Sequence, residues 1–159
     1  MVKFKITKNG YDNIKSDLDN LVNNELPAIL KAVSDARELG DLKENEEYAS
    51  AKEKQKIIQF NISTLNSRLL DAEIIDTRLY TKEQKEIVNF GAKVKLLDLD
   101  TNKTLEYQLV SEFESNLDEG KIAVESLVGK MLLNKGKDDE VDIKTPKGLK
   151  AYKILNIEY

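Results

Sequence analysis

Two long stretches of the chain carry apolar residues at helical spacing. In the first, apolar positions recur every three or four residues, pause, and resume: Ile14, Leu18, Leu21, then Ala28, Ala32 and Ala36, with Ile29, Leu30 and Val33 widening the stripe. Pro27 falls in the pause. Because proline lacks a backbone N–H, the helix is predicted to bend or restart there.

The second stretch has a more regular pattern of alternating three- and four-residue steps. Its positions are Tyr48, Ala51, Gln55, Ile58, Ile62, Leu65, Leu69 and Ala72. This heptad spacing is typical of a coiled-coil seam. Two such helices joined by a short segment must lie antiparallel and bury the two stripes together. The sequence therefore predicts a narrow helical hairpin, a finger about 45 Å long at 1.5 Å per residue.

The ends of the two helices carry candidate caps, and the segment between them is rich in carboxylates. Thr7 is the expected N-cap of the first helix, and Gly40 is its expected end. Asp41 and Glu44 have the spacing of a capping box for the second helix. Two carboxylates three positions apart on a projecting turn could also present their oxygens to Mg²⁺. The two interpretations are compatible, since a cap fixes the orientation of a ligand.

In the C-terminal half the hydrophobic period changes to two, which predicts strands. Strands are expected at 88–97 and 104–110 around a turn at 98–103, and at 139–144 and 149–157, with a short helix within 125–133. The polar segment 77–86 is expected to be a linker between a finger domain, 1–76, and a C-terminal domain, 87–159. The fold class is thus α+β, with a helical hairpin followed by a small antiparallel sheet that carries a short helix.

Composition narrows the possible chemistry. The 159 residues are 40% hydrophobic and 34% charged, with a formal net charge of −4 and neither His nor Cys. The absence of these two residue types excludes Ser-His and Cys-His nucleophile systems and nearly all zinc sites. A metal would have to be a hard ion bound by carboxylates. The N-terminus lacks the pattern of a signal peptide, and no apolar run approaches membrane-spanning length, so a cytoplasmic protein without a membrane partner is expected.

The segment between the helices also resembles a known family. From Ala36 to Tyr48 it reads Ala-Arg-Glu-Leu-Gly-Asp-Leu-Lys-Glu-Asn-Glu-Glu-Tyr, followed by Ala51-Lys52 and Gln55. This pattern resembles the bacterial Gre transcript cleavage factors, and their GreA-like branch most of all. Further matches lie at Thr7, Gly10 and Pro27 and in the segments 90–94 and 144–148, so the resemblance covers essentially the whole chain.

The resemblance implies a coiled-coil finger followed by an FKBP-like domain, and a partner, RNA polymerase. The globular domain is expected to dock on the β′ coiled coil at the rim of the secondary channel, and the finger to enter the channel. Asp41 and Glu44 would then hold Mg²⁺ and the attacking water jointly with the polymerase, which cleaves the 3′ end of backtracked RNA. The chain is expected to act as a monomer and to be no enzyme by itself.

Other residues receive roles through the same resemblance. Arg37 and Lys52 match basic positions that face the RNA, although Arg37 could instead pair with Asp41, and Lys52 has no acidic residue three or four positions away. Gly40, Leu42, Asn45 and Tyr48 would support the tip. Tyr48 could stack on a base or fill the thin interior of the finger.

The expected polymerase-docking residues are Ser126, Gly129 and Lys130, which match the family pattern. Ala123, Leu127, Asn116 and Asn134 depart from it, in the half of the chain to which the resemblance assigns docking. Leu127 and Val128 can also be interpreted as core residues of the short helix. Leu26 stands where the family commonly has a basic residue, so the basic patch of the finger is thinner.

Two other functions fit the same fold. One is an inhibitor or simple binding module that occupies the secondary channel without stimulating cleavage. The intact run from Gly40 to Asn45 favours cleavage over this alternative. The other is a peptidyl-prolyl isomerase, which is disfavoured because the C-terminal half has few aromatic residues and no Trp for an apolar pocket.

Overall fold

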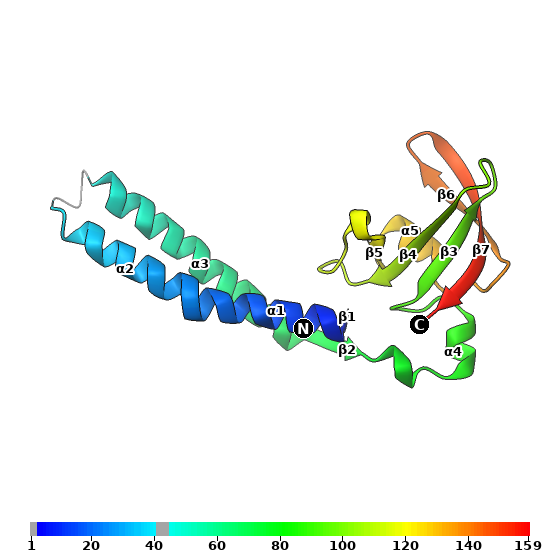
Figure 1. Cartoon of the computed structure of the whole chain (residues 1–159), viewed down its shortest axis with the longest axis horizontal. Helices are drawn as coiled ribbons and strands as arrows, with labels where there is room; N and C mark the ends of the chain where they lie inside the picture. The colour runs from blue at the N-terminus through cyan, green and yellow to red at the C-terminus, as the bar shows by residue number, and fades with distance from the viewer. Residues whose placement is uncertain (1–2, 41–44) are drawn as a thin grey trace. The chain divides into compact units, whose positions relative to one another are not determined.

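The computed structural model describes residues 3–40 and 45–159, which form two compact units. One unit is the helical finger, Tyr11–Ala72, and the other combines Lys3–Gly10 with Glu73–Tyr159 around a curled sheet (Figure 1). The predicted α+β class is confirmed.

The first arm of the finger is helical throughout, but a π-helical turn interrupts the α-helix midway. It consists of α1 (Lys8–Asn20), a π-helical turn η1 (Leu21–Glu25) and α2 (Leu26–Arg37). Thr7 is the N-cap of α1, as predicted, because its Oγ1 accepts a hydrogen bond from the Gly10 N–H at 3.0 Å. Pro27 lies in the first turn of α2, so the predicted restart is also confirmed.

The π turn changes which residues of α2 face the second arm. Ala28 and Ala32, predicted for the seam, are exposed, whereas Ile29 is half-buried and Val33 and Ala36 are buried. A π turn takes more residues per revolution than an α-helix, so the inward-facing positions after it are displaced along the sequence. The prediction of Ala28 and Ala32 as seam residues was therefore wrong, because it assumed an unbroken α-helical phase.

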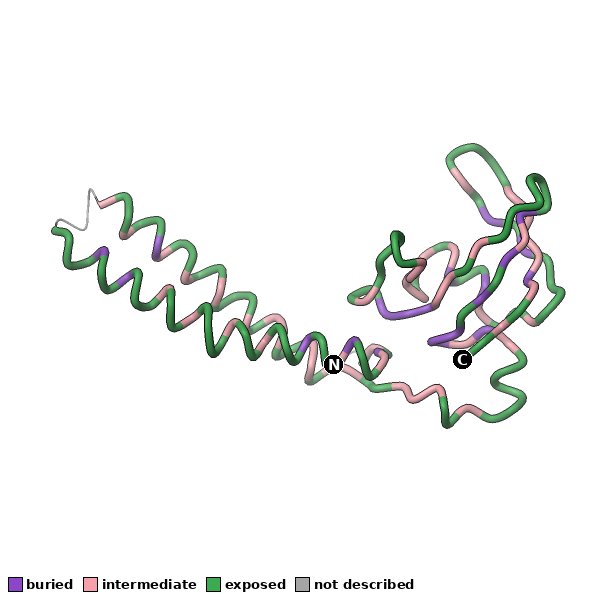
Figure 2. Tube along the Cα trace, viewed as in Figure 1, coloured by how far each residue is buried: buried purple, intermediate pink, exposed green. Residues whose placement is uncertain are grey.

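The second arm is a single helix, α3 (Glu46–Asp71), and its predicted seam is confirmed. Ala51 is buried, and the other predicted seam positions from Tyr48 to Ala72 are half-buried. Figure 2 shows how little of the finger is fully buried compared with the strands of the sheet. The finger therefore has a thin interior, which agrees with the narrow hairpin that the sequence predicts.

The segment predicted as a linker has local structure of its own. β1 (Phe4–Thr7) pairs with β2 (Ala72–Ile75), and the 3-10 turn η2 (Thr77–Leu79) and α4 (Lys82–Glu86) follow. Thr81 begins α4 through a complete capping box with Gln84. The polar composition of this stretch thus reflects exposed turns and helix caps.

The C-terminal sheet has five strands in the order β5-β4-β3-β7-β6. β3 (Lys93–Asp98), β4 (Thr104–Val110), β6 (Glu140–Thr145) and β7 (Gly148–Glu158) pair antiparallel. The short strand β5 (Lys121–Ala123) pairs parallel to β4, so the sheet is mixed and not purely antiparallel. The polar stretch between β4 and β5 contains the 3-10 turn η3 (Leu117–Glu119). It returns the chain so that β5 can run parallel to β4 at the edge of the sheet. The FKBP-like fold that the resemblance implies for this unit stays a prediction.

The core of this unit lies on one face of the sheet. Alternating residues of β3, Val94 and Leu96, are fully buried and pack with Leu109 of β4 and Ile154 of β7. The helix α5 (Leu127–Leu132) covers this face and contributes the fully buried Leu132. Within the described parts of the chain, no helix is long and apolar enough to cross a membrane.

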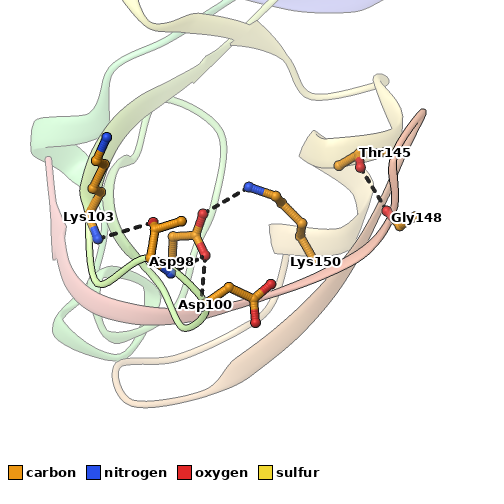
Figure 3. Close-up of polar contacts among 7 residues, drawn as sticks. Asp98, Asp100, Lys103, Thr145, Gly148 and Lys150 are labelled. Carbon is orange, nitrogen blue, oxygen red and sulfur yellow. Dashed lines mark hydrogen bonds and ion pairs between the residues drawn. The ribbon is translucent and has the colours of Figure 1, made fainter.

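A buried carboxylate organises the turn between β3 and β4. Asp98 is 4% exposed, accepts hydrogen bonds from the Asp100 and Thr101 N–H groups, and pairs with Lys150 Nζ at 3.0 Å (Figure 3). The Lys150 hydrogen bond is the largest cause that lowers the pKa of Asp98, and Asp98 in turn raises the pKa of Lys150. This contact ties the turn to β7.

Candidate functional site

Asn45 joins the two arms at the end of the finger. Its Oδ1 accepts a hydrogen bond from the Tyr48 N–H at 3.0 Å, which makes it the N-cap of α3. Its Nδ2 donates to the carbonyl oxygen of Ala36 in the last turn of α2, at 2.7 Å. One side chain thus satisfies backbone groups of both helices, and it ties the last turn of α2 to the first turn of α3.

The identity of this cap corrects one interpretation of the sequence. We predicted that Asp41 caps the second helix, but that helix begins at Glu46 and its N-cap is Asn45. Asp41, Leu42 and Glu44 lie outside the described residues, so their predicted roles as metal ligands and tip support stay predictions. Gly40, just before them, has φ of 128°, a conformation that favours glycine.

Arg37 and Tyr48 contact each other across the end of the finger. The guanidinium carbon of Arg37 lies 5.8 Å from the centre of the Tyr48 ring, a cation–π geometry. A hydrogen bond with Arg37 is the main cause that lowers the pKa of Tyr48, and the charge of Lys52 acts in the same direction. The structure therefore brings three of the predicted residues together, and Tyr48 is half-buried beside a cation.

Lys52 has no acidic residue three or four positions away, but it has a neutral polar partner on the same helix. Its Nζ donates to Gln55 Oε1 at 3.3 Å. Gln55 lies three positions ahead on the same helix, so the contact was accessible from spacing alone. Arg37, Tyr48, Lys52 and Gln55 thus form one polar face, which we call the basic face.

The candidate metal ligands at the end of the finger are carboxylate oxygens. Over residues 3–40 and 45–159, no cluster of three or more Asp, Glu, His or Cys side chains is placed to hold a metal ion. Asp41 and Glu44 are hard oxygen donors, which fits Mg²⁺. Two carboxylates alone leave most of the octahedral shell of Mg²⁺ to water or to another molecule.

Two of the three predicted docking residues have structural roles. Ser126 is the N-cap of α5, since its Oγ accepts from the Gly129 N–H at 3.1 Å and donates to the Ala123 carbonyl oxygen at 2.6 Å. Gly129 is buried, and a Cβ there would lie 2.3 Å from that same oxygen. Both residues therefore seat α5 closely against the end of β5.

The third predicted docking residue, Lys130, lies on the exposed side of α5. Lys130 is exposed, and Leu127 is 57% exposed. The interpretation of Leu127 as a core residue is therefore wrong, whereas Val128 is partly buried and packs against the core. Leu127, Lys130 and Met131 are the exposed side chains of α5.

Two departures from the family pattern have local explanations. Asn134 has φ of 67°, and asparagine tolerates this left-handed conformation better than most residues, so it can stand where the family has glycine. Asn116 is the N-cap of η3 and accepts a hydrogen bond from the Asp118 N–H at 3.1 Å. Both substitutions therefore fit the local backbone.

Comparison with known proteins covers the whole chain. The profile described as "Transcription elongation factor, N-terminal" matches residues 4–74, and that described as "Transcription elongation factor, GreA/GreB, C-term" matches residues 83–159. The transcription elongation factor GreA of Neorickettsia sennetsu is 42% identical over 159 residues, which cover 100% of this chain and 98% of that one. The GreA of Ruegeria pomeroyi is 41% identical over 160 residues, covering 100% and 99%.

A solved structure is also similar to the chain. The crystal structure of GreA factor homolog 1 (Gfh1) of Thermus thermophilus is 28% identical, covers 99% of both chains and superposes with a TM-score of 0.44. The family profiles and the two full-length relatives show that this chain belongs to the GreA/GreB family of transcription elongation factors.

Proposed function

We propose that this elongation factor binds RNA polymerase, places the end of its finger in the secondary channel, and stimulates Mg²⁺-dependent cleavage of backtracked RNA. The observation that carries the proposal is the match of both family profiles to a chain whose finger ends in an acidic segment. Asn45, bonded to both α2 and α3, holds the two arms together at this end of the finger.

Asp41 and Glu44 are proposed to bind Mg²⁺ together with carboxylates of the polymerase. When bound, the ion lowers the pKa of water and stabilises charge on the leaving oxygen of the phosphodiester. Asp41 and Glu44 would fill only part of the Mg²⁺ coordination shell, so the active site is proposed to belong to the polymerase and to be completed by this protein. The factor is proposed to act as a monomer.

The basic face is proposed to lie toward the 3′ end of the nascent RNA. Arg37 and Lys52 carry positive charge beside Tyr48, and phosphate oxygens are the expected partners of such cations. The contact with Tyr48 holds the Arg37 guanidinium close to the helix. Both cations therefore lie close to α3.

The C-terminal unit is proposed to dock at the rim of the channel through α5. Lys130 and the exposed Leu127 provide a charge and an apolar contact for the β′ coiled coil of the polymerase. Ser126 and Gly129 act indirectly, because they fix the position of the helix.

The sign of the effect on transcription tests the proposal. Purified protein is added to backtracked polymerase complexes that hold labelled RNA, in the presence of Mg²⁺. Short 3′ fragments and renewed elongation are expected. Uncleaved RNA would contradict the proposal, and slower elongation by active complexes would favour the channel-occupying inhibitor.

A further inference from the structure

One face of the finger carries a long groove between its two arms. Three hollows follow one another along it, with volumes of about 360, 380 and 670 Å³ from the base toward the tip. The first two share Glu25 in their linings, and the second and third share Ile29 and Lys54. They therefore form one continuous groove from Asp17 to Leu39, roughly 33 Å at 1.5 Å per residue.

The floor of the groove is apolar along its middle. The middle hollow is lined by Ala28 and Ile29 from α2 and by Ile57 and Ile58 from α3, and Ile57 is 52% exposed. Ala28 lines this hollow because the π turn displaces it from the seam. Its small side chain leaves space above it for a partner's side chain. Exposed apolar side chains gathered in a groove indicate a surface that a partner covers.

The rim of the groove is mainly acidic. Among the described lining residues, Lys54 and Arg68 are basic, and the acidic ones are Asp17, Glu25, Asp35, Glu46 and Glu47. An apolar floor between acidic edges complements an amphipathic helix whose apolar stripe is flanked by Lys or Arg. The length of the groove suits such a helix of about 20 residues.

We propose that this groove binds a basic amphipathic α-helix of RNA polymerase, which packs against the two arms as a third helix. The proposal rests on the function proposed above, in which the finger enters the polymerase. None of the residues of the basic face lines the three hollows. The finger thus has two working faces, one for a protein helix and one for RNA.

Matched lysine substitutions test the proposal. Ile57→Lys places a cation on the groove floor, and Leu30→Lys changes a similarly exposed residue, 46% against 52%, that lies outside the linings. Binding to purified polymerase is measured by competition with labelled wild-type protein, and thermal unfolding checks both variants. We expect Ile57→Lys to weaken binding about tenfold or more and Leu30→Lys to stay within about twofold. Equal affinity of wild type and Ile57→Lys would overturn the groove proposal.

A crosslinking measurement keeps the test independent of variant stability. A photoreactive residue replaces Ala28 in the groove or Leu30 outside it, and each protein is irradiated in complex with purified polymerase. A crosslink from position 28 to a polymerase helix flanked by basic residues supports the proposal. A crosslink from position 28 to RNA, or to a segment of polymerase that is not helical, overturns it. If wild-type protein does not bind polymerase at all, the proposed function fails as well, whereas wild-type affinity of Ile57→Lys refutes the groove alone.

Discussion

Asn45 is the residue on which the end of the finger depends. Its side chain bonds to α3 through Tyr48 N–H and to α2 through the Ala36 carbonyl oxygen. The sequence placed Asn45 among the tip-support residues but assigned the cap to Asp41. Sequence spacing could not decide between Asp41 and Asn45 as the N-cap, because Asp and Asn are comparable N-caps and each of these two residues precedes acidic residues. The second contact of Asn45, with the Ala36 carbonyl oxygen, comes from the opposite arm, so a local pattern does not reveal it.

Replacing Asn45 with Ala should destabilise the finger and impair cleavage more than polymerase binding. Loss of the cap and of the second hydrogen bond should lower the free energy of unfolding by about 1–3 kcal/mol. Asn45→Asp is the matched control, because it keeps the acceptor for Tyr48 N–H and loses only the donor to Ala36. Urea unfolding followed by circular dichroism measures the change. Equal stability of wild type and Asn45→Ala would show that the two bonds contribute little.

Asp98 should make the stability of the C-terminal unit depend on pH at both extremes. Its pKa is lowered in the folded state, so its contribution is present above the unfolded pKa of about 3.9 and is lost as pH falls through the lower folded value. The pKa of Lys150 is raised, so its contribution is present below about pH 10.4 and is lost as pH rises further.

Denaturant unfolding between pH 2 and 7 tests the acid limb, with wild type compared with Asp98→Asn. The variant should be less stable at neutral pH and should lose less stability on acidification. Asp100→Asn, at an exposed neighbouring carboxylate, is the control and should retain the acid dependence of the wild type. Parallel acid profiles of Asp98→Asn and wild type would contradict the assignment.

At the scale of elements, the two arms and most strands were predictable because their apolar periods are long or strictly alternating. The phase of α2 was not predictable, since Leu21–Glu25 has no residue type that marks a π turn. The strand β5 was missed because three residues, Lys121–Ala123, are too few for a period to show. Its parallel pairing with β4 depends on how the preceding loop folds back, which composition does not encode.

The close contact of α5 with the end of β5 gives a prediction at this scale. In Gly129→Ala the new methyl group would lie 2.3 Å from the Ala123 carbonyl oxygen, a backbone atom, so the helix must shift. We expect a loss of about 1–3 kcal/mol in the free energy of unfolding, as for other overpacked sites. Lys130→Ala, at an exposed position of the same helix, should change stability little and weaken polymerase binding instead. A Gly129→Ala protein as stable as wild type would contradict the packing argument.

At the scale of the whole molecule, the described residues form two compact units. The finger has a thin interior and two distinct faces, and the sheet unit has the larger core and presents α5. Fold class and family were accessible from sequence because the tip pattern is long and specific. The groove was not, because its lining includes Ala28 and Ala32, which the sequence had placed in the seam.

The central claim is that the carboxylates of the tip complete a metal site in the polymerase. The measurement is RNA cleavage in backtracked complexes by wild type, Asp41→Asn and Glu44→Gln, each at a concentration shown to saturate polymerase binding. Both substitutions keep the size of the side chain and remove its charge. We predict that both variants bind with wild-type affinity and that cleavage falls by at least about 100-fold, because each removes a proposed metal ligand. Cleavage at wild-type rates by both variants would contradict the account.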